Sequence, residues 1–195
     1  MKAALIAVVA IVAVVALWYV STYNSLVSER EGVRQSWGQV ENVYQRRADL
    51  IPNLVATVKG YAAHESGVFK AVAEARAKVG SVNVDASSLM NNMEAQKNFL
   101  AAQQGLGNAL SHLIALQENY PTLKANENFL TLQSQLEGTE NRIAVERGRN
   151  QKAIQTYNTD VQGFFTSIIA RRNGFEVFPY FEAKQGSDSA PQVKF

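Results

Sequence analysis

Two clusters of charged and amide side chains lie within otherwise apolar stretches of this sequence. The first is Arg46-Arg47-Ala48-Asp49 with Asn53 shortly after it, and the second is Thr139-Glu140-Asn141-Arg142 with Glu146-Arg147 one turn further on. Carboxylates and guanidinium groups gathered in this way could act as an acid–base pair, bind a ligand, or pair with one another inside a helical protein.

Counting heptads places Arg47, Thr139 and either Glu146 or Arg147 near core positions, where an unpaired charge is very costly. We therefore expect a buried polar layer that fixes the register of the helices, with a ligand site and a catalytic pair as the alternatives. The expected members of this layer are Arg47, Asp49, Asn53, Glu140, Asn141, Arg142, Glu146 and Arg147. If Arg47 pairs with a buried carboxylate, its replacement by Met is expected to cost roughly 3–5 kcal/mol.

The sequence lacks the residue patterns of common enzymes and metal proteins. It has no cysteine, which excludes disulfides, thiolate metal sites and cysteine catalysis, and it has two histidines. A di-iron bundle needs Glu-x-x-His pairs, but the residue three positions before each histidine is Tyr61 or Ala109. No P-loop, His-Glu-x-x-His or Gly-x-Ser-x-Gly pattern occurs. We therefore expect no catalytic, cofactor-binding or metal-binding residues, with His64 on the surface or in a loop and His112 at the edge of the core.

The charge balance of the sequence bears on which partners the protein can bind. Nineteen Lys and Arg against seventeen Asp and Glu leave a formal net charge of +2. Nucleic acid is therefore not expected as a partner, because phosphate binding needs a concentrated basic face. Hydrophobic residues make up 47% of the chain, which is enough to bury a sizeable core.

Three long stretches with helical periodicity must position the polar clusters. Apolar residues recur at steps of three and four, which puts one apolar stripe along each helix and which a strand cannot satisfy. The stripe residues are Leu26, Val33, Trp37, Val40, Tyr44, Ile51, Leu54, Val58 and Tyr61 in the first stretch, Leu89, Met93, Leu100, Leu110, Leu113 and Leu116 in the second, and Phe129, Leu132, Leu136, Ile143, Ile154, Tyr157, Val161, Phe164 and Ile168 in the third.

Breaks in the pattern divide these stretches. Residues 80–88 form a linker that ends in capping residues, and Asn119-Tyr120-Pro121-Thr122 ends one helix and starts the next. Pro52 is expected to kink the first stretch, and His64-Glu65-Ser66-Gly67 is a candidate second interruption. Because short loops between long stripes make neighbours antiparallel, we expect an all-α fold. It is an elongated antiparallel up-and-down helical bundle of three long helical stretches, or of four helices if the first is broken, and its last helix runs from about residue 122 to 171.

The N-terminal segment predicts a membrane anchor. Residues 3–20 carry no charge, and at ~1.5 Å per residue they reach across a hydrocarbon core of ~30 Å. Aromatic residues expected at the membrane interface are Trp18, Tyr19 and Tyr23. We expect a retained transmembrane helix over residues 1–22, with a cleaved signal peptide as the alternative. Lys2 weakly favours an N-terminus on the inner side and a bundle on the outer side.

A tail of different composition follows the expected bundle of residues 23–172. Residues 173–195 begin with aromatics and end in a polar run. The aromatic residues expected to form an interface are Phe175, Phe178, Tyr180 and Phe181. Because monomers rarely expose such patches, we expect the tail to pack on its own bundle, on the membrane surface or on a neighbouring subunit.

The chain closely resembles the LemA family. The resemblance lies in the motifs Tyr23-Asn24-Ser25-Leu26-Val27, Arg46-Arg47-Ala48-Asp49-Leu50-Ile51-Pro52-Asn53-Leu54-Val55, Val58-Lys59-Gly60-Tyr61-Ala62-Ala63-His64-Glu65, Glu118-Asn119-Tyr120-Pro121-Thr122-Leu123-Lys124-Ala125-Asn126, Thr139-Glu140-Asn141-Arg142-Ile143-Ala144, Tyr157-Asn158 and Pro191-Gln192-Val193-Lys194-Phe195. It implies a membrane-anchored helical bundle in bacteria, with no established reaction and with some members associated with magnetosome membranes. Asn150 stands where the family pattern favours an aromatic residue, and we expect weaker packing there.

These observations favour a non-enzymatic scaffold that self-associates as a homo-oligomer at the bacterial inner membrane and organises it or its proteins. The small residues Ala3, Ala7, Ala10 and Ala13 would let anchor helices approach closely. The alternative is an accessory binding module that recruits another membrane or envelope protein, such as a protease. No cofactor is expected for either function.

Overall fold

The computed structural model describes residues 1–82 and 92–181, and these ranges fold into helices with no strand among them. The helices are α1 (Lys2–Lys59), α2 (Ser66–Ser81), α4 (Met93–Ala115), the short 3-10 helix η1 (Leu116–Glu118), α5 (Pro121–Lys124), α6 (Glu127–Gln162) and α7 (Thr166–Arg172). The prediction of an all-helical fold with a long apolar N-terminal helix is confirmed.

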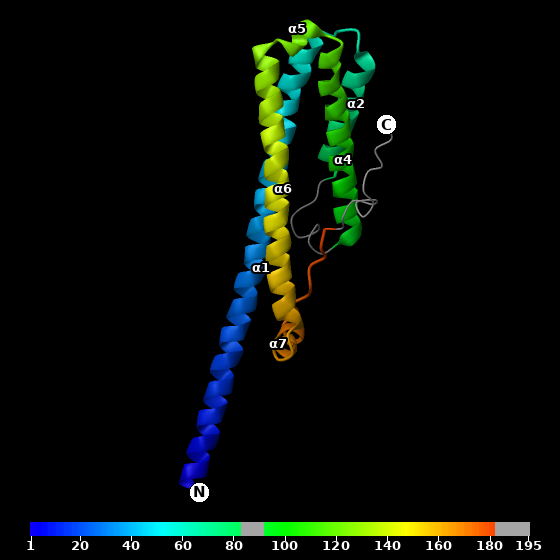
Figure 1. Cartoon of the computed structure of the whole chain (residues 1–195). Helices are drawn as coiled ribbons and strands as arrows, with labels where there is room; N and C mark the ends of the chain where they lie inside the picture. Colours follow the sequence, from blue (N-terminus) through cyan, green and yellow to red (C-terminus); the bar gives the residue numbers. More distant parts are fainter. Residues whose placement is uncertain (83–91, 182–195) are drawn as a thin grey trace, which may run out of the picture.

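The helices lie side by side in two closely packed pairs, α1 with α6 and α2 with α4 (Figure 1). Hydrogen bonds give the direction of α1 relative to α6. The Asn126 side-chain amide donates to the Tyr61 hydroxyl at 2.9 Å, and the Asn150 amide donates to the Ser36 hydroxyl, also at 2.9 Å. Residue numbers therefore fall along α1 as they rise along α6, and these two helices run in opposite directions.

The buried residues form two hydrophobic clusters along the length of the molecule. The α7-side cluster contains Leu26, Val33, Trp37, Val40, Tyr44, Phe99, Ile143, Ile154, Tyr157, Val161, Ile169, Ala170, Phe175, Phe178 and Phe181. The distal cluster contains Ile51, Leu54, Val58, Ala62, Val72, Leu106, Leu110, Leu113, Leu116, Leu123, Phe129 and Leu136. From Val33 to Val58 the buried positions of α1 alternate between steps of four and three, as the periodicity predicted.

Most helix boundaries fall near the predicted breaks. α1 continues through Pro52 and ends at Lys59, and α2 begins at Ser66 within the predicted interruption. The predicted break at 119–122 lies between η1 and α5. The predicted linker over 80–88 is partly wrong, because Gly80 and Ser81 belong to α2; residues 83–88 lie outside the described ranges.

The prediction of one uninterrupted last helix from about residue 122 to 171 is wrong. The Asn126 side chain accepts a hydrogen bond from the Phe129 backbone N–H at 2.9 Å, and this cap starts α6 as a separate helix. At the other end the Thr166 hydroxyl donates to the Gly163 carbonyl at 3.2 Å, within the turn between α6 and α7. Local side-chain bonds therefore replace helical bonds at both interruptions.

Several residues of the predicted stripes lie outside the core. Those that are exposed are Tyr61, Met93, Phe164 and Ile168, whereas Leu100 and Leu132 are half-buried and Leu89 lies outside the described residues. Met93 lies in the first turn of α4, and Phe164 lies in the turn after α6.

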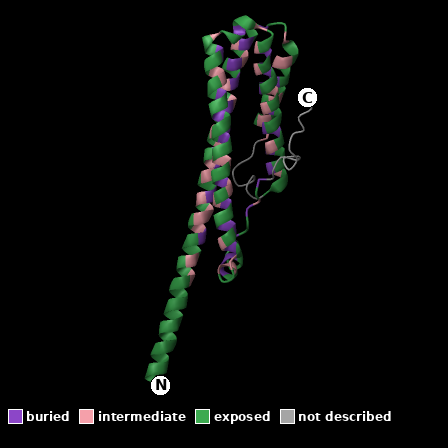
Figure 2. Cartoon of the chain, in the orientation of Figure 1, coloured by how far each residue is buried: buried purple, intermediate pink, exposed green. Residues whose placement is uncertain are grey.

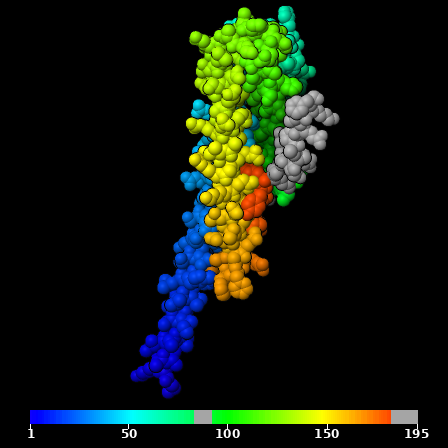
Figure 3. Space-filling view, in the orientation of Figure 1, coloured from blue at the N-terminus to red at the C-terminus, as the bar shows by residue number. Residues whose placement is uncertain are grey.

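The first part of α1 projects away from the rest of the molecule (Figure 3). Its residues are exposed from the N-terminus to Trp18, as Figure 2 shows by colour. Among the described helices, α1 has the length and apolar composition to cross a membrane, and none of its most apolar 18-residue stretch is buried in the protein.

The C-terminal segment turns back along the helices after α7. Gly174 has a φ of +69°, in the left-handed region that favours glycine, and the Phe175 N–H bonds the Ala170 carbonyl at 3.0 Å. Residues 175–181 then run back alongside α6 (Figure 1).

Candidate functional site

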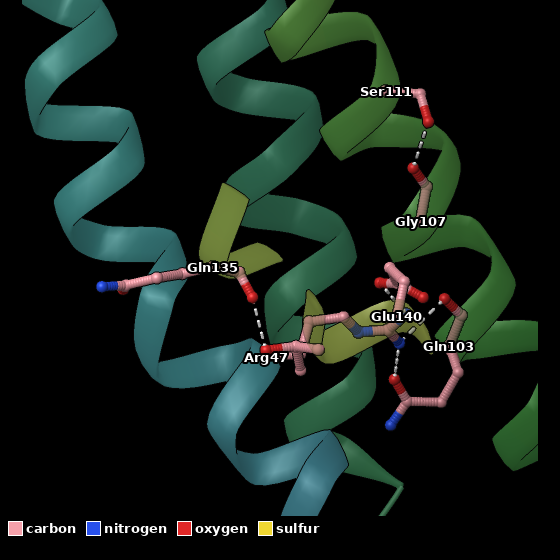
Figure 4. A network of polar contacts seen from close by, with 7 residues as sticks. Arg47, Gln103, Gly107, Ser111, Gln135 and Glu140 are labelled. Carbon is pink, nitrogen blue, oxygen red and sulfur yellow. Dashed lines mark hydrogen bonds and ion pairs between the residues drawn. The ribbon is translucent and has the colours of Figure 1, made fainter. Parts of the chain in front are cut away.

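Arg47 is the centre of a polar cluster that joins three helices (Figure 4). Its side chain comes from α1 and is 3% exposed. The guanidinium donates from Nη1 to Glu140 Oε1 of α6 at 2.9 Å. It donates from Nη2 to the Gln103 carbonyl of α4 at 3.2 Å, and also to the Gln103 side-chain oxygen. One buried cation therefore ties α1, α4 and α6 together at one level.

This cluster lies between the two hydrophobic clusters. On α1, Arg47 stands between Tyr44 of the α7-side cluster and Ile51 of the distal cluster. Thr139 is buried at the same level on α6, and its hydroxyl donates to the Gln135 carbonyl at 2.7 Å. A shift of one helix by a turn would bring Arg47 against apolar side chains, so the cluster penalises wrong registers.

The Arg47 guanidinium is occupied by the protein's own acceptors. Both terminal nitrogens are hydrogen-bonded, and the group also lies 5.2 Å from the centre of the Tyr44 ring. A hollow beside Glu140 is lined by Leu110, Ser111 and neighbouring residues of α4 and α6. Since both terminal nitrogens of Arg47 are bound to the protein's own oxygens, the geometry favours a structural tie over a ligand site.

The structure brings together Arg47 and Glu140 and separates the other predicted members of the layer. Those on exposed faces are Asp49, Asn53, Asn141 and Arg142. Asp49 instead accepts a hydrogen bond from Gln45 at 2.7 Å on the surface of α1. At ~100° per residue, Asp49 points about 200° away from Arg47 around the helix, which explains why neighbours in sequence do not share the interior. Glu140 is itself 45% exposed, so its carboxylate reaches water.

Glu146 and Arg147 lie further along α6 and make different contacts. Glu146 pairs with Arg149 at 2.8 Å along the same helix. The Arg147 guanidinium lies 5.0 Å from the centre of the Phe181 ring. Arg147 therefore contacts the C-terminal segment, and it also interacts with Tyr44, whose ring lies against the Arg47 guanidinium.

Four amide side chains are buried among the described residues, and three of them, Gln103, Asn150 and Asn158, make hydrogen bonds that sequence reasoning did not predict. Gln103 is 6% exposed and lies in step with Phe99 and Leu106 on α4, a spacing that could have revealed it. Asn150 is 1% exposed and donates to the Ser36 hydroxyl and to the Val33 carbonyl, so the expected weak packing is replaced by hydrogen bonds between α6 and α1.

The third amide, Asn158, binds the backbone of the C-terminal segment. Its Nδ2 donates to the Phe178 carbonyl at 2.8 Å, and its Oδ1 accepts from the Phe178 N–H at 2.9 Å. Gln151 adds a bond to the Phe181 carbonyl at 3.1 Å. An extended segment cannot satisfy its own backbone, so these amides supply its partners.

Of the four predicted interface aromatics in the tail, three are buried against the chain's own helices. Phe175 meets Tyr23 edge-on with ring centres 5.7 Å apart, and the rings of Phe178 and Phe181 lie tilted against Tyr157 and Trp37 at 5.0 and 5.7 Å. Tyr180 is 48% exposed and points away from this packing.

Two carboxyl groups meet between α1 and α6, closer to the predicted anchor. Burial, followed by a hydrogen bond and charge repulsion from Asp160, raises the pKa of Glu29 from 4.5 to about 7. The Ser25 hydroxyl donates to Glu29 at 3.1 Å and acts in the opposite direction. This pair is a pH-sensitive point in the helix contact.

The described residues contain no group of three or more His, Asp or Glu placed to hold a metal ion. His64 lies on the surface in a turn, as predicted. His112 is also exposed, which corrects its expected place at the edge of the core.

Comparison with known proteins finds similar sequences. The family model described as LemA family matches residues 36–195. The magnetosome protein MamQ 2 of Paramagnetospirillum magneticum is 28% identical over 182 residues, covering 86% of this chain and 67% of the relative. The magnetosome protein MamQ of Magnetospirillum gryphiswaldense is 29% identical over 189 residues, with 88% and 70% covered. The protein LemA of Metamycoplasma hominis is 21% identical over 171 residues, with 86% and 72% covered.

Proposed function

Because this chain belongs to the LemA family, we propose that it is a non-enzymatic scaffold that self-associates at a bacterial membrane and organises that membrane or its proteins. The observation that carries the proposal is the form of α1. α1 is one continuous helix whose first residues are apolar and exposed. From Leu26 onward it packs against the other helices, which the polar cluster around Arg47 joins to it. Such a helix transmits the position of a membrane anchor directly to the body, without a flexible joint.

The proposal includes an arrangement in the membrane. Residues 1–22 form a single-pass anchor, residues 23–172 an antiparallel up-and-down bundle, and residues 173–195 a tail. The opposite directions of α1 and α6 support the bundle, and the apolar start of α1 supports the anchor. We place the protein in the inner membrane, with the N-terminus inside and the bundle on the outer side.

One observation supports self-association, and a second supports a role at a membrane. The anchor has small residues at Ala3, Ala7 and Ala10, all exposed in the single chain, and such residues let transmembrane helices approach closely. Two relatives are named magnetosome proteins, and a membrane compartment is a setting in which a scaffold would act.

The test is the molar mass of the full-length protein in nanodiscs and in mild detergent, measured by light scattering with the lipid or detergent subtracted. A homo-oligomer in both supports the scaffold. A monomer in both contradicts self-association and favours the alternative, an accessory module that recruits another membrane protein.

Matched variants would locate the contact. Ala7→Leu with Ala10→Leu enlarges the small-residue face and is expected to reduce the oligomer to smaller species. Val8→Leu with Val12→Leu adds bulk on the opposite side of α1 and is expected to leave the mass unchanged. Equal effects of the two double variants on the molar mass would mean that the alanine face is not the contact between subunits.

A further inference from the structure

The turn between α6 and α7 has an exposed apolar surface beside the predicted membrane anchor. Phe164, Phe165 and Ile168 are 82%, 63% and 65% exposed. Within α7, Ile169 and Ala170 are buried against the helices, so α7 has one packed face and one bare face. Leaving this much apolar surface in water is unfavourable by ~25 cal/mol per Å².

The position of this surface along α1 identifies what covers it. The Phe165 ring meets Trp18 edge-on with ring centres 6.3 Å apart, and the Asn173 amide donates to the Tyr19 hydroxyl at 2.9 Å. Both ends of α7 therefore touch neighbouring residues of α1, so α7 lies beside one level of that helix (Figure 1).

That level is the end of the apolar segment. Residues 3–20 carry no charge, and a hydrocarbon core of ~30 Å needs about 20 residues of helix. Trp18 and Tyr19 are thus at the membrane interface, where aromatic residues concentrate. A bilayer that extended further, towards Glu29, would cover α7 more deeply.

The charges on the same side of α7 fit lipid headgroups. Arg171 and Arg172 are exposed and follow Ile168 by three and four residues, which places them on its side of the helix. Long Arg side chains next to an apolar surface can extend their charged ends to the headgroups while the apolar residues enter the bilayer interface.

We propose that the α6–α7 turn is a second membrane-contacting element, in which Phe164, Phe165 and Ile168 enter the interface of the bilayer spanned by α1 and Arg171 and Arg172 meet anionic headgroups. This rests on the proposed anchoring by α1. A second contact gives the helical body two attachments to the membrane. Together they fix the tilt and rotation of the body relative to the membrane, which a single helix leaves free.

The cysteine-free chain allows a direct test by single nitroxide labels. The full-length protein would be reconstituted in vesicles of phosphatidylcholine and phosphatidylglycerol, and the accessibility of each label to oxygen and to a water-soluble nickel complex would be measured. Ser167→Cys places the reporter on α7 while keeping all three apolar side chains. Ala10→Cys reports on α1, and Val145→Cys is the matched exposed control on α6, away from the anchor.

We expect oxygen to exceed the nickel complex at residues 10 and 167, and the reverse at residue 145. Replacing Phe164, Phe165 and Ile168 with Ser is expected to shift the residue 167 label towards water, with helical content unchanged. If the label at residue 10 lies in lipid but the label at residue 167 is as accessible to the nickel complex as the label at residue 145, the inference is overturned. An aqueous residue 10 overturns the anchoring and the inference together. Low accessibility to both reagents at 167, with spin broadening lost on dilution with unlabelled protein, overturns it in favour of contact with a second copy.

Discussion

Replacing Arg47 with Met tests whether the three-helix cluster fixes the fold. Met keeps most of the aliphatic chain but removes the donors to Glu140 and Gln103. The effect on Gln103 matters most. Gln103 is 6% exposed, and its side-chain oxygen would remain buried without a donor. Such an orphaned acceptor costs about 1–3 kcal/mol.

Two features lower the cost below the 3–5 kcal/mol expected for a pair with both partners buried. Glu140 is 45% exposed, so water replaces the lost guanidinium. The Arg47 Nε is already buried without a hydrogen-bond partner, and the substitution removes that unsatisfied group. We therefore expect Arg47→Met to destabilise the protein by about 2 kcal/mol, which for a chain of this size lowers the Tm by about 4–8 °C.

The assay is thermal unfolding of the full-length protein in detergent, followed by far-UV circular dichroism. Asp49→Asn is the matched control, expected to leave the Tm almost unchanged because its carboxylate lies on the exposed face of α1. The double variant Arg47→Met with Gln103→Leu removes both buried polar partners and should recover most of the lost Tm. A Tm unchanged by Arg47→Met, or equal losses for Arg47→Met and Asp49→Asn, would refute the buried tie.

Three further predictions concern the contacts nearer the membrane. The raised pKa of Glu29 means that the folded protein retains a proton that the unfolded chain releases between pH 4.5 and about 7. The free energy of unfolding should therefore fall across that window as pH rises. Glu29→Gln should stabilise the protein by about 1 kcal/mol after solvent screening and so raise the Tm above pH 7, and it should leave the Tm unchanged near pH 4. Equal effects at both pH values would contradict this. Asn158→Leu leaves the Phe178 N–H and carbonyl without their partner, and should cost about 2–3 kcal/mol and speed hydrogen exchange at Phe178, with exchange at Leu54 in the distal cluster as the internal reference. Deleting residues 174–195 removes three buried Phe side chains and should lower the Tm with the oligomer size unchanged; lost assembly with an unchanged Tm would mean that the tail is a subunit contact.

The apolar spacing was sufficient to predict the main packing face of α1. Every stripe residue from Leu26 to Val58 is buried, because a helix places residues three and four apart on one side. The same rule predicted Arg47 as interior. It failed for Asp49 and Asn53, which were assigned by closeness in sequence, although their angular positions around the helix already exclude them from the Arg47 side.

The contacts of the third stretch were harder to predict. The apolar spacing continues from Val161 through Phe164 to Ile168, so the sequence suggests one helix with one buried face. The chain instead breaks at Gly163, and the last two apolar residues become exposed. Periodicity reports that a face is apolar and does not report whether protein or lipid covers it.

The C-terminal segment completes the half of the body that contains α7. The buried residue of α2, Val72, belongs to the distal cluster, and the α7-side cluster contains Phe175, Phe178 and Phe181 instead. A short extended segment therefore takes the place of a helix beside α1, α4 and α6. Its backbone depends on single side chains such as Asn158 for hydrogen bonds, whereas a helix satisfies its own. Because this segment has no helical hydrogen bonds of its own, local opening should begin with it while the distal cluster stays closed.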